Sequence, residues 1–358
     1  MTMLTQVVLG RTYDFSHVIG RLGGTGNGFT NPYNVVVAGN DVVYVLNRGG
    51  EGRPGGPPLV PNGTGARIGK WRFGKEPGDE EYLTEFGGSG EGNRVGDGPG
   101  GMIWGVGLAI DSKENVYLTD EWLNRITVYD KDGKLLHHWG VPGDSDGELN
   151  RPSGVGIDNE DNLFVVDSLN HRVQKFTSDG TFVKNWGGLG TGKGQFDSPW
   201  GITIDREGNV YVADHKNHRV QKFTPEGEYL SEFGSYGDGP GELNRPSDIA
   251  VDPEGDVYVC DWANNRVQIY TSEGKFITTL RGDAQELSAL AKEEVESNDD
   301  VVKARRLVKT MEPEWRFALP TGLSYDPKYQ RLIVTDSQRL RLQVYKKIKN
   351  YMAPQVQL

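Results

Sequence analysis

Short runs of β-branched and aromatic residues alternate with turn-forming residues along most of the chain. Between residues 151 and 187 the apolar runs are GVGID, NLFVVD, RVQKF and TFVKNWG, and they are separated by NED, SLNH and TSDG. Runs of this length and composition are typical of β-strands, and the residues between them favour tight turns. The segment therefore predicts four consecutive antiparallel strands, here called A, B, C and D.

This four-strand segment recurs along the chain. Four positions keep a period of 47 residues over four copies. The tracks are Asp111, Asp158, Asp205 and Asp252; Asp120, Asp167, Asp214 and Asp261; Arg125, Arg172, Arg219 and Arg266; and Trp139, Trp186, Phe233 and Leu280. Two degenerate copies flank them, the first beginning at NPYNVVV with Asn47 and Arg67, the last at LPTGLSYD with Asp336 and Arg341. One such sheet cannot bury both faces, whereas sheets packed around an axis can, so six copies predict an all-β, six-bladed β-propeller.

The two ends of the chain are expected to close the ring. The last copy stops after its third strand, LRLQVYKKI, and a matching fourth strand, FSHVIGRLGG, lies at the start, where Leu22 and Gly23 align with Trp186 and Gly187. We therefore expect residues 14–22 to pair with residues 340–347 as the outer strand of blade 6, which leaves no free sheet edge. The chain then forms one domain, residues 1–358, with blades near residues 31–87, 102–140, 151–187, 198–234, 245–282 and 319–348.

The copies resemble the NHL-repeat family. Its pattern is P-x-G-V-A-V-D, then a strand ending in V-A-D, then N-H-R-V, which stands here as SPWGITIDREGNVYVADHKNHRVQKF. The resemblance covers nearly the whole chain outside two insertions. It implies the propeller fold but no single function, because NHL propellers serve as protein-interaction platforms, RNA binders and enzymes.

Three recurring features are interpreted as structural. Asp120 and Arg125 stand five residues apart across the B–C turn, and their recurrence suits a carboxylate–guanidinium pair in each blade. His171 and His218 lie in the N-H-R segment, where other blades carry Asn, and are expected to pack blades together rather than bind a ligand. The stretch GGLGTGKGQ resembles a phosphate-binding loop, but no Ser or Thr follows Lys193, so it is predicted to be an interblade turn.

Composition narrows the partner and the compartment. The formal net charge of −11 argues against DNA or an anionic membrane surface as a partner. Cys260 is the single cysteine, which excludes an intrachain disulfide and a cysteine-based zinc site. The N-terminal MTMLTQVVLGRTYDF lacks the basic region and long apolar run of a signal peptide. A cytoplasmic location is the default expectation, and an exported form is the alternative if a leader has been removed.

Two irregular insertions are expected on one face of the ring. Because strands alternate in direction, the D–A connections and the B–C turns emerge on the same face, here called the first face, and the A–B and C–D turns on the second. Residues 49–64 extend the B–C turn of blade 1, and residues 283–318 connect blade 5 to blade 6. The second insertion predicts two helices, with Asp283 and Glu286 as a capping box and Pro313 as the stop. We expect the insertions to form a lid over the propeller mouth, or alternatively a homo-oligomer contact.

The candidate site consists of first-face positions that break the repeat. After the Asp that ends strand B, blades 3 and 6 carry the small residues Ser168 and Ser337. The other four blades carry Arg48, Glu121, His215 and Trp262 there. The glycine that opens strand A, kept as Gly107, Gly154, Gly201 and Gly322, is replaced by Asn34 and Asp248, and the preceding position offers Tyr33 and Trp200. Because strand A is innermost, these side chains are expected to converge near the axis and to form a small-molecule pocket.

The residue types suggest roles within this pocket. His215 is the candidate general base, because imidazole titrates near neutral pH. Glu121 or Asp248 would orient it or hold a cation, and Arg48 would bind a carboxylate or stabilise developing negative charge. The substrate would contact Tyr33, Asn34, Trp200, Asp248 and Trp262. Alternatively, the oxygen atoms of Asn34, Glu121 and Asp248 would hold a divalent cation, calcium or zinc, at the propeller axis.

These residues favour an enzyme that acts on a small molecule. The propeller of peptidylglycine amidating lyase is similar in repeat, and that family holds its metal with several axial histidines. Here only His215 stands on the first face outside the N-H-R segments, so an identical zinc chemistry is not expected. Our first interpretation is a hydrolase or lyase for a small polar or carboxylated substrate. A non-catalytic protein-interaction platform is second, and RNA binding is third, because no basic face with interleaved aromatic residues is apparent.

Overall fold

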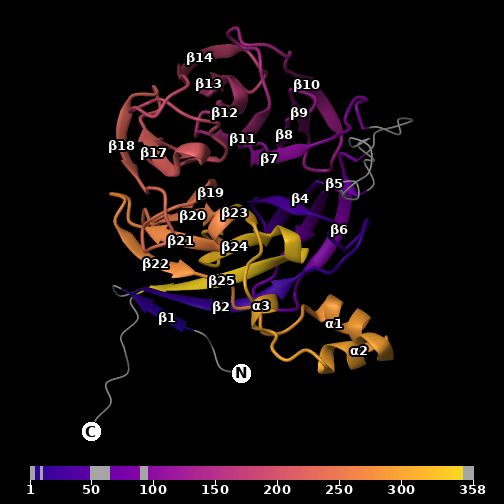
Figure 1. The fold of residues 1–358 in the computed structure, drawn as a ribbon. Helices are drawn as coiled ribbons and strands as arrows, with labels where there is room; N and C mark the ends of the chain where they lie inside the picture. Colours follow the sequence, from indigo (N-terminus) through magenta and orange to yellow (C-terminus); the bar gives the residue numbers. More distant parts are fainter. Residues whose placement is uncertain (1–4, 9–10, 49–64, 89–95, 350–358) are drawn as a thin grey trace, which may run out of the picture.

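The computed structural model is a ring of six antiparallel β-sheets (Figure 1). It describes residues 5–8, 11–48, 65–88 and 96–349. The innermost strands of neighbouring blades contact one another all the way around the ring, including the contact between blade 6 and blade 1. The predicted six-bladed β-propeller is therefore confirmed.

The strands follow the predicted order A to D within each blade. Blade 1 is β3 (Pro32–Val37), β4 (Val42–Arg48), β5 (Ala66–Arg72) and β6 (Glu81–Phe86), and blade 2 is β7 (Gly105–Ile110), β8 (Val116–Asp120), β9 (Arg125–Tyr129) and β10 (Leu135–Trp139). Blade 3 is β11 (Pro152–Ile157), β12 (Leu163–Asp167), β13 (Arg172–Phe176) and β14 (Phe182–Gly187). Blade 4 is β15 (Ile202–Ile204), β16 (Val210–Asp214), β17 (Arg219–Phe223) and β18 (Tyr229–Phe233). Blade 5 is β19 (Pro246–Val251), β20 (Val257–Asp261), β21 (Arg266–Tyr270) and β22 (Phe276–Leu280).

Blade 6 joins the two ends of the chain. It contains β23 (Pro320–Asp326), β24 (Arg331–Asp336) and β25 (Arg341–Lys349) from the C-terminal part, and β2 (Arg11–Ile19) pairs antiparallel with β25. The predicted closure by the N-terminal strand is thus confirmed. An unpredicted fifth strand, β1 (Thr5–Val8), forms a hairpin on the outer side of β2.

The register of the closing strand differs from the prediction by three residues. Ile19 pairs with Leu342, and it is Gly20 that has the positive φ of Gly187, at 109° against 122°. Leu22 instead forms an isolated β-bridge with Phe29 in the connection to blade 1. Leu189 and Phe196 form the same bridge in the connection between blades 3 and 4. Several glycines follow β2, so more than one of them could be aligned with Gly187, and the prediction used Gly23 where the structure has Gly20.

A buried ionic cluster fastens the closing strands to blade 5. The Lys347 ammonium on β25 lies 2.7 Å from an Asp256 carboxylate oxygen and also binds Asp252. The Arg11 guanidinium on β2 donates to Asp256 at 2.6 Å, and the Tyr13 hydroxyl donates to it at 3.2 Å. Burial alone would lower the pKa of Lys347, but hydrogen bonds to Asp252 and Asp256 raise it above its ordinary value. The cluster therefore holds a charged lysine between two buried carboxylates.

Removing this lysine charge is expected to destabilise the fold strongly. Lys347→Met leaves two buried carboxylates with fewer partners, and breaking a buried ion pair on one side costs about 3–5 kcal/mol. Lys346→Met is the matched control, because Lys346 lies 3.8 Å from Glu76 in a partly exposed pair, and such pairs contribute at most about 1 kcal/mol. Urea denaturation of both variants measures the difference. Equal losses for the two variants would contradict a structural role for the cluster.

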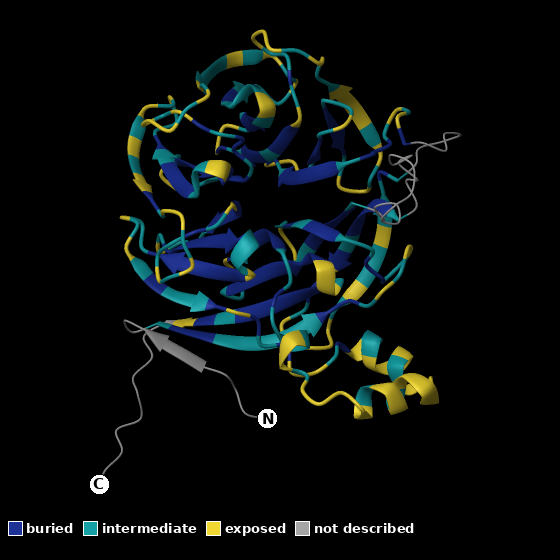
Figure 2. Cartoon of the chain, viewed as in Figure 1, coloured by how far each residue is buried: buried dark blue, intermediate teal, exposed yellow. Residues whose placement is uncertain are grey.

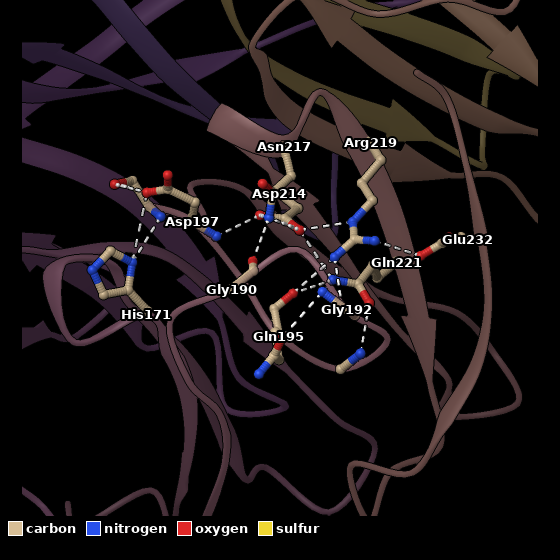
Figure 3. Close-up of polar contacts among 12 residues, drawn as sticks. His171, Gly190, Gly192, Gln195, Asp197, Asp214, Asn217, Arg219, Gln221 and Glu232 are labelled. Carbon is tan, nitrogen blue, oxygen red and sulfur yellow. Dashed lines mark hydrogen bonds and ion pairs between the residues drawn. The ribbon is translucent and has the colours of Figure 1, made fainter. Parts of the chain in front are cut away.

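The recurring aspartate and arginine form the predicted pair in four blades. In blade 4, the Arg219 guanidinium donates to Asp214 at 2.9 Å and to the backbone oxygens of Gly192 and Gln195 (Figure 3). Gln221 also donates to Gln195 O and to Asp214. The stretch GGLGTGKGQ is therefore an interblade turn held by the next blade, as predicted.

Blades 1 and 2 depart from this pattern. In blade 1 Asn47 replaces the aspartate, and Arg67 pairs with Glu85 at 2.9 Å. In blade 2 Asp120 accepts hydrogen bonds from the backbone N–H groups of residues 103, 104, 122 and 123. Arg125 binds backbone oxygens of residues 97, 98 and 101 instead of Asp120. The expectation of one such pair in every blade is wrong for these two blades.

The histidines of the N-H-R segment connect neighbouring blades. His171 Nδ1 accepts a hydrogen bond from Ser198 N at 3.0 Å (Figure 3), and His218 Nδ1 accepts one from Arg245 N at 3.1 Å. Asn124 and Asn265 accept the equivalent bonds in other blades. All four residues have φ between 51° and 57°, a left-handed conformation in which Asn and His are enriched. Their predicted role in blade packing is confirmed.

The second insertion forms three short helices at the edge of the ring. They are α1 (Ala289–Glu296), α2 (Asp299–Arg306) and α3 (Glu312–Trp315). The cap of α1 is Ser288, whose hydroxyl accepts from Ala291 N, so the predicted capping box at Asp283 and Glu286 is wrong. Pro313 lies inside α3 rather than at the end of the second helix.

The predicted lid is not formed by these helices. The Ser288 hydroxyl donates to Gly20 O, Arg21 and Glu294 lie 3.7 Å apart, and Leu290 packs on the core between blades 6 and 1. Figures 1 and 2 show α1 and α2 outside the ring, with mostly exposed surfaces. Residues 49–64 lie outside the described part of the chain. No helix in the described residues is long and apolar enough to cross a membrane.

Candidate functional site

The small residues at the end of strand B are structural, as predicted. The Ser168 hydroxyl donates to Pro199 O at 2.8 Å, and the Ser337 hydroxyl donates to Pro32 O at 2.6 Å. In each case the acceptor belongs to the following blade. Blades 3 and 6 therefore use this position to fix the neighbouring backbone. The other four blades carry large side chains there, and one of them, His215, also binds the proline carbonyl of the following blade, Pro246 O.

Arg48 and Glu121 form an ion pair between blades 1 and 2. The Arg48 guanidinium also lies 4.7 Å from the ring centre of Tyr33 and 5.0 Å from that of Trp104. Trp104 in turn packs edge-on against Trp122, with ring centres 5.1 Å apart. A guanidinium held between two rings is oriented by cation–π attraction as well as by its carboxylate. This half of the site is here called the arginine half.

His215, Trp200 and Trp262 form a second cluster from blades 4 and 5. The His215 ring lies 4.5 Å from Trp200 and 6.0 Å from Trp262, and the two tryptophans are 6.2 Å apart. His215 Nδ1 is 3.1 Å from Pro246 O, so this nitrogen carries the proton and donates it to the carbonyl. Burial lowers the pKa of His215 to about 4. The imidazole is therefore neutral near pH 7, with its lone pair on Nε2. This is the histidine half.

The two halves meet at the propeller axis. Tyr33 belongs to blade 1 and Trp200 to blade 4, which lie opposite each other in a ring of six, and their ring centres are 6.4 Å apart. The structure therefore brings Tyr33, Arg48, Trp200 and the histidine cluster to one end of the axis, as expected. It does not bring Arg48 and Glu121 into contact with His215, because the Tyr33–Trp200 pair lies between them. Glu121 consequently orients Arg48 and not His215.

Asn34 in blade 1 and Asp248 in blade 5 occupy the strand A position that follows the one held by Tyr33 and Trp200. Their blades lie on either side of blade 6. Asn34 Nδ2 donates to Asp248 Oδ2 at 3.2 Å. Asn34 Oδ1 accepts from Leu108 N at 3.3 Å, and Asp248 Oδ2 accepts from Leu323 N at 2.9 Å. Each side chain thus binds the N–H that follows the strand A glycine of the next blade. Asp248 is buried, and this burial raises its pKa to about 7.

The titration of Asp248 predicts a pH-dependent stability. The pKa of Asp248 is about 7 in the folded protein, against an ordinary value of 3.8. Between these two pH values the folded state binds more protons than the unfolded state. The contribution of Asp248 to stability is therefore lost as the pH rises from about 4 to 7. The slope is at most about 1.4 kcal/mol per pH unit. We expect the double substitution Asn34→Gly and Asp248→Gly, which restores the residue of the other blades, to reduce this slope. Denaturation at pH 5 and pH 8 measures it, and an unchanged slope would contradict the assignment.

The three predicted metal ligands do not form a metal site. Asn34 turns its amide nitrogen toward Asp248, an orientation fixed by the Leu108 N–H on its oxygen, so it offers Asp248 a donor and no free oxygen. Glu121 is paired with Arg48 in a different part of the mouth. Among the described residues, no cluster of three or more His, Cys, Asp or Glu side chains could hold a metal ion. These donors therefore do not fit calcium or zinc.

A cavity lies on the second-face side of the Asn34–Asp248 bridge. It has a volume of about 240 Å³ and follows the axis between the innermost strands. Its walls include Val36, Ile110, Ile157, Ile204, Val251 and Tyr325. The bridge separates this cavity from the aromatic residues of the first face. The predicted pocket is thus closed at the axis by two layers, Tyr33 with Trp200 and then Asn34 with Asp248.

Trp104 and Trp122 were missed in the sequence. Trp104 is partly exposed and Trp122 is 48% exposed, beside the Arg48–Glu121 pair. Trp122 directly follows Glu121, and Trp104 is the residue before β7, two residues before the strand A positions that were considered. Their aromatic character in otherwise small or polar connections was the available signal. They extend the aromatic surface over blade 2.

Comparisons with solved structures find the same fold at low sequence identity. A gluconolactonase from Xanthomonas campestris has a TM-score of 0.58 and 14% identity, over 95% of this chain and 91% of that chain. A streptogramin B lyase has a TM-score of 0.55 and 12% identity, over 96% and 100%. A catalytically inactive virginiamycin B lyase from Staphylococcus aureus, solved with quinupristin, has a TM-score of 0.52 and 14% identity, over 94% and 99%. At these identities the likeness shows the fold alone.

Sequence comparison identifies the repeat itself. No curated protein matches the chain. The NHL repeat model matches residues 149–176, 196–223 and 243–270, which run from the interblade turn to strand C in blades 3, 4 and 5. The remaining blades carry the same strands with more divergent residues. The chain therefore carries NHL repeats in blades 3, 4 and 5 and folds as a six-bladed β-propeller.

Proposed function

We propose that the first face binds a small molecule across the Tyr33–Trp200 pair and that the protein is a hydrolase or lyase for a polar or carboxylated substrate. The observation that carries this proposal is the convergence of the residues that break the repeat. Large aromatic, basic and acidic side chains from four blades gather at one end of the axis, while blades 3 and 6 keep structural serines there. An aromatic surface with a few oriented polar groups is typical of small-molecule sites.

The two halves would act on different parts of such a substrate. His215 Nε2 would accept a proton, from water in a hydrolase or from carbon in a lyase, because its Nδ1 proton is held by Pro246 O. Arg48, fixed by Glu121, Tyr33 and Trp104, would bind a carboxylate or stabilise negative charge on oxygen. A substrate that contacts both groups has to cover the Tyr33–Trp200 pair.

The solved structures with this fold are consistent with such chemistry. They include lyases and a gluconolactonase, whose names describe reactions on small molecules. The staphylococcal lyase described as catalytically inactive has a histidine replaced by alanine. A histidine-dependent reaction therefore occurs on a propeller of similar fold.

A protein-interaction platform is the second candidate. The observation in its favour is the exposed Trp122, since aromatic anchors dominate many protein interfaces. In that case Trp122→Ala should weaken partner binding and His215→Ala should leave it mostly intact. In an enzyme, His215→Ala is the variant with the larger effect.

A ligand panel tests the proposal. We expect small carboxylates, lactones or cyclic esters to raise the melting temperature of the wild-type protein, and mass spectrometry of the hits then identifies the reaction. Hydrolysis adds one water to the substrate, whereas elimination adds none. Arg48→Met should remove the stabilisation by carboxylates, and Arg72→Met, which changes an exposed pair with Glu81 on blade 1, is the control. Stabilisation that survives Arg48→Met and Trp200→Ala would contradict the proposed site.

A further inference from the structure

Helices α1 and α2 form a projecting hairpin with no buried residue. Isolated helices of this length are not stable in water, since most helix stability in proteins comes from packing an apolar face. The hairpin's contacts with the rest of the described chain include Ser288 with Gly20, Leu290 on the core, Arg21 with Glu294 at 3.7 Å, and Arg305 with Glu314 at 2.9 Å. The outer side of α2 is uncovered in the single chain (Figure 2).

The uncovered side of α2 carries an apolar stripe. Val301 and Ala304 are three residues apart on one face of α2, and Leu307 and Val308 follow directly after the helix ends at Arg306. Val301 is 38% exposed and Val308 is 50% exposed, and the adjacent Leu307 is 83% exposed. Ala304 is also exposed and lies at the centre of the stripe. An exposed stripe of this kind is typical of a helix–helix contact.

The charges at the two ends of α2 are opposite. The helix begins with Asp299 and Asp300 and ends with Lys303, Arg305 and Arg306, and Lys309 follows. An antiparallel copy of the same helix would place the acidic start of each beside the basic end of the other. Two copies of a chain with net charge −11 otherwise repel each other. The segment is therefore complementary to itself in one orientation.

We propose that two copies of this chain form a twofold-symmetric dimer in which the α2 stripes pack antiparallel and cross at Ala304. Such an interface uses the same patch on both subunits, which is what a self-complementary surface provides. The small Ala304 side chain at the crossing point lets the two helix backbones approach closely. One helix pair with its flanking residues is a small interface, so we expect a dissociation constant on the order of micromolar. The dimer does not depend on the proposed enzyme function, because α2 lies away from the axial residues.

Cysteine cross-linking tests the geometry. Cys260, the only cysteine, is buried, so a single introduced thiol reports its own position. Ala304→Cys should give a covalent dimer under mild oxidation, because the two thiols face each other across the twofold axis. Glu293→Cys, an exposed position on α1, is the matched control and should remain monomeric. No cross-link at residue 304, or equal cross-linking of both variants, would overturn the proposal.

Sedimentation of the full chain tests the association itself. The wild-type protein should become dimeric as its concentration rises, and Leu307→Asp or Val308→Asp should weaken the dimer at least tenfold. Leu189→Asp is the control, since Leu189 is 65% exposed in an interblade turn far from α2. A wild-type protein that stays monomeric up to about 100 µM would overturn the dimer. A dimer that tolerates both Leu307→Asp and Val308→Asp would overturn the proposed interface, because another surface must then be used.

Discussion

Deletion of residues 1–23 is expected to abolish soluble folding of the propeller. The deletion removes β2, and with it the pairing along the outer edge of β25 from Leu342 to Lys349, while β24 still pairs with the inner edge. It also removes the buried side chains of Tyr13 and Ile19 and the Arg11 partner of Asp256. An open blade exposes a strand edge that can pair with other chains, so aggregation should accompany the loss of stability.

A shorter deletion is the matched control. Deletion of residues 1–10 removes β1, which pairs only with β2, and leaves the β2–β25 ladder in place. This variant should stay soluble and melt within a few degrees of the full chain. Soluble yield and thermal unfolding of both variants provide the comparison. If the protein without residues 1–23 folds as well as the one without residues 1–10, closure by β2 is not needed for the ring.

His215→Ala is expected to lower kcat/KM at least a hundredfold on any substrate found in the panel. General base catalysis raises a reaction rate about 10²–10⁴-fold. Among the described residues, His215 is the one imidazole in the histidine half of the site. His215→Gln keeps a hydrogen-bond donor to Pro246 O without a base at Nε2, so it should lose activity to a similar degree. His215 is buried against Trp200 and bonds Pro246 O, so His215→Ala should also lower the melting temperature, and His215→Gln, which keeps that bond, should lower it less.

His218→Ala is the control for this result. His218 lies three residues away but accepts a blade-packing hydrogen bond from Arg245 N. Its loss should reduce stability and leave kcat/KM nearly unchanged. If His218→Ala and His215→Ala reduce activity equally, the loss reflects the blade rather than a base at His215.

The pH profile gives an independent check on the base. Because burial lowers the pKa of His215 from 6.5 to about 4, activity should persist below pH 6 and fall only as the pH approaches 4. A profile that falls with a midpoint near 6.5 would indicate a different base or an imidazole that is exposed to water in the working enzyme.

The fold was predictable because each blade repeats the groups that hold it. Asp214 and Arg219 occur at a fixed spacing since both bind the same interblade turn, and His218 occupies a left-handed position that Asn can also take. The closing strand was placed three residues too late. In that segment Gly20 and Gly23 both fit a glycine position, and they are distinguished by the pairing of Ile19 with Leu342 and by the positive φ of Gly20.

The site was predictable only in part. Strand A is innermost, so the positions of Tyr33 and Trp200 near the axis followed from the repeat. Which side chains pair there depends on their lengths and directions, and Arg48 reaches Glu121 and Trp104 rather than the histidine. A period in the sequence gives the height of a residue on the propeller but not the direction of its side chain.

The second insertion shows the same limit on a larger scale. Its connection to the first face was inferred from strand direction, and it does start there. Its path depends on Gly282, which has φ of 91° and has no room for a Cβ beside Phe317 N, and on the hydrogen bond from Ser288 to Gly20. These contacts turn the helices outward, along the edge of blade 6. No local pattern in the sequence distinguishes that path from one across the mouth.

A crystal structure with a ligand from the panel tests the proposed site most directly. We predict that the ligand lies over the Tyr33–Trp200 pair on the first face, with one end at Arg48 and the other within hydrogen-bond distance of His215 Nε2. A ligand bound in the axial cavity beyond Asn34 and Asp248, or against the α1–α2 hairpin, would contradict a functional site at the first face.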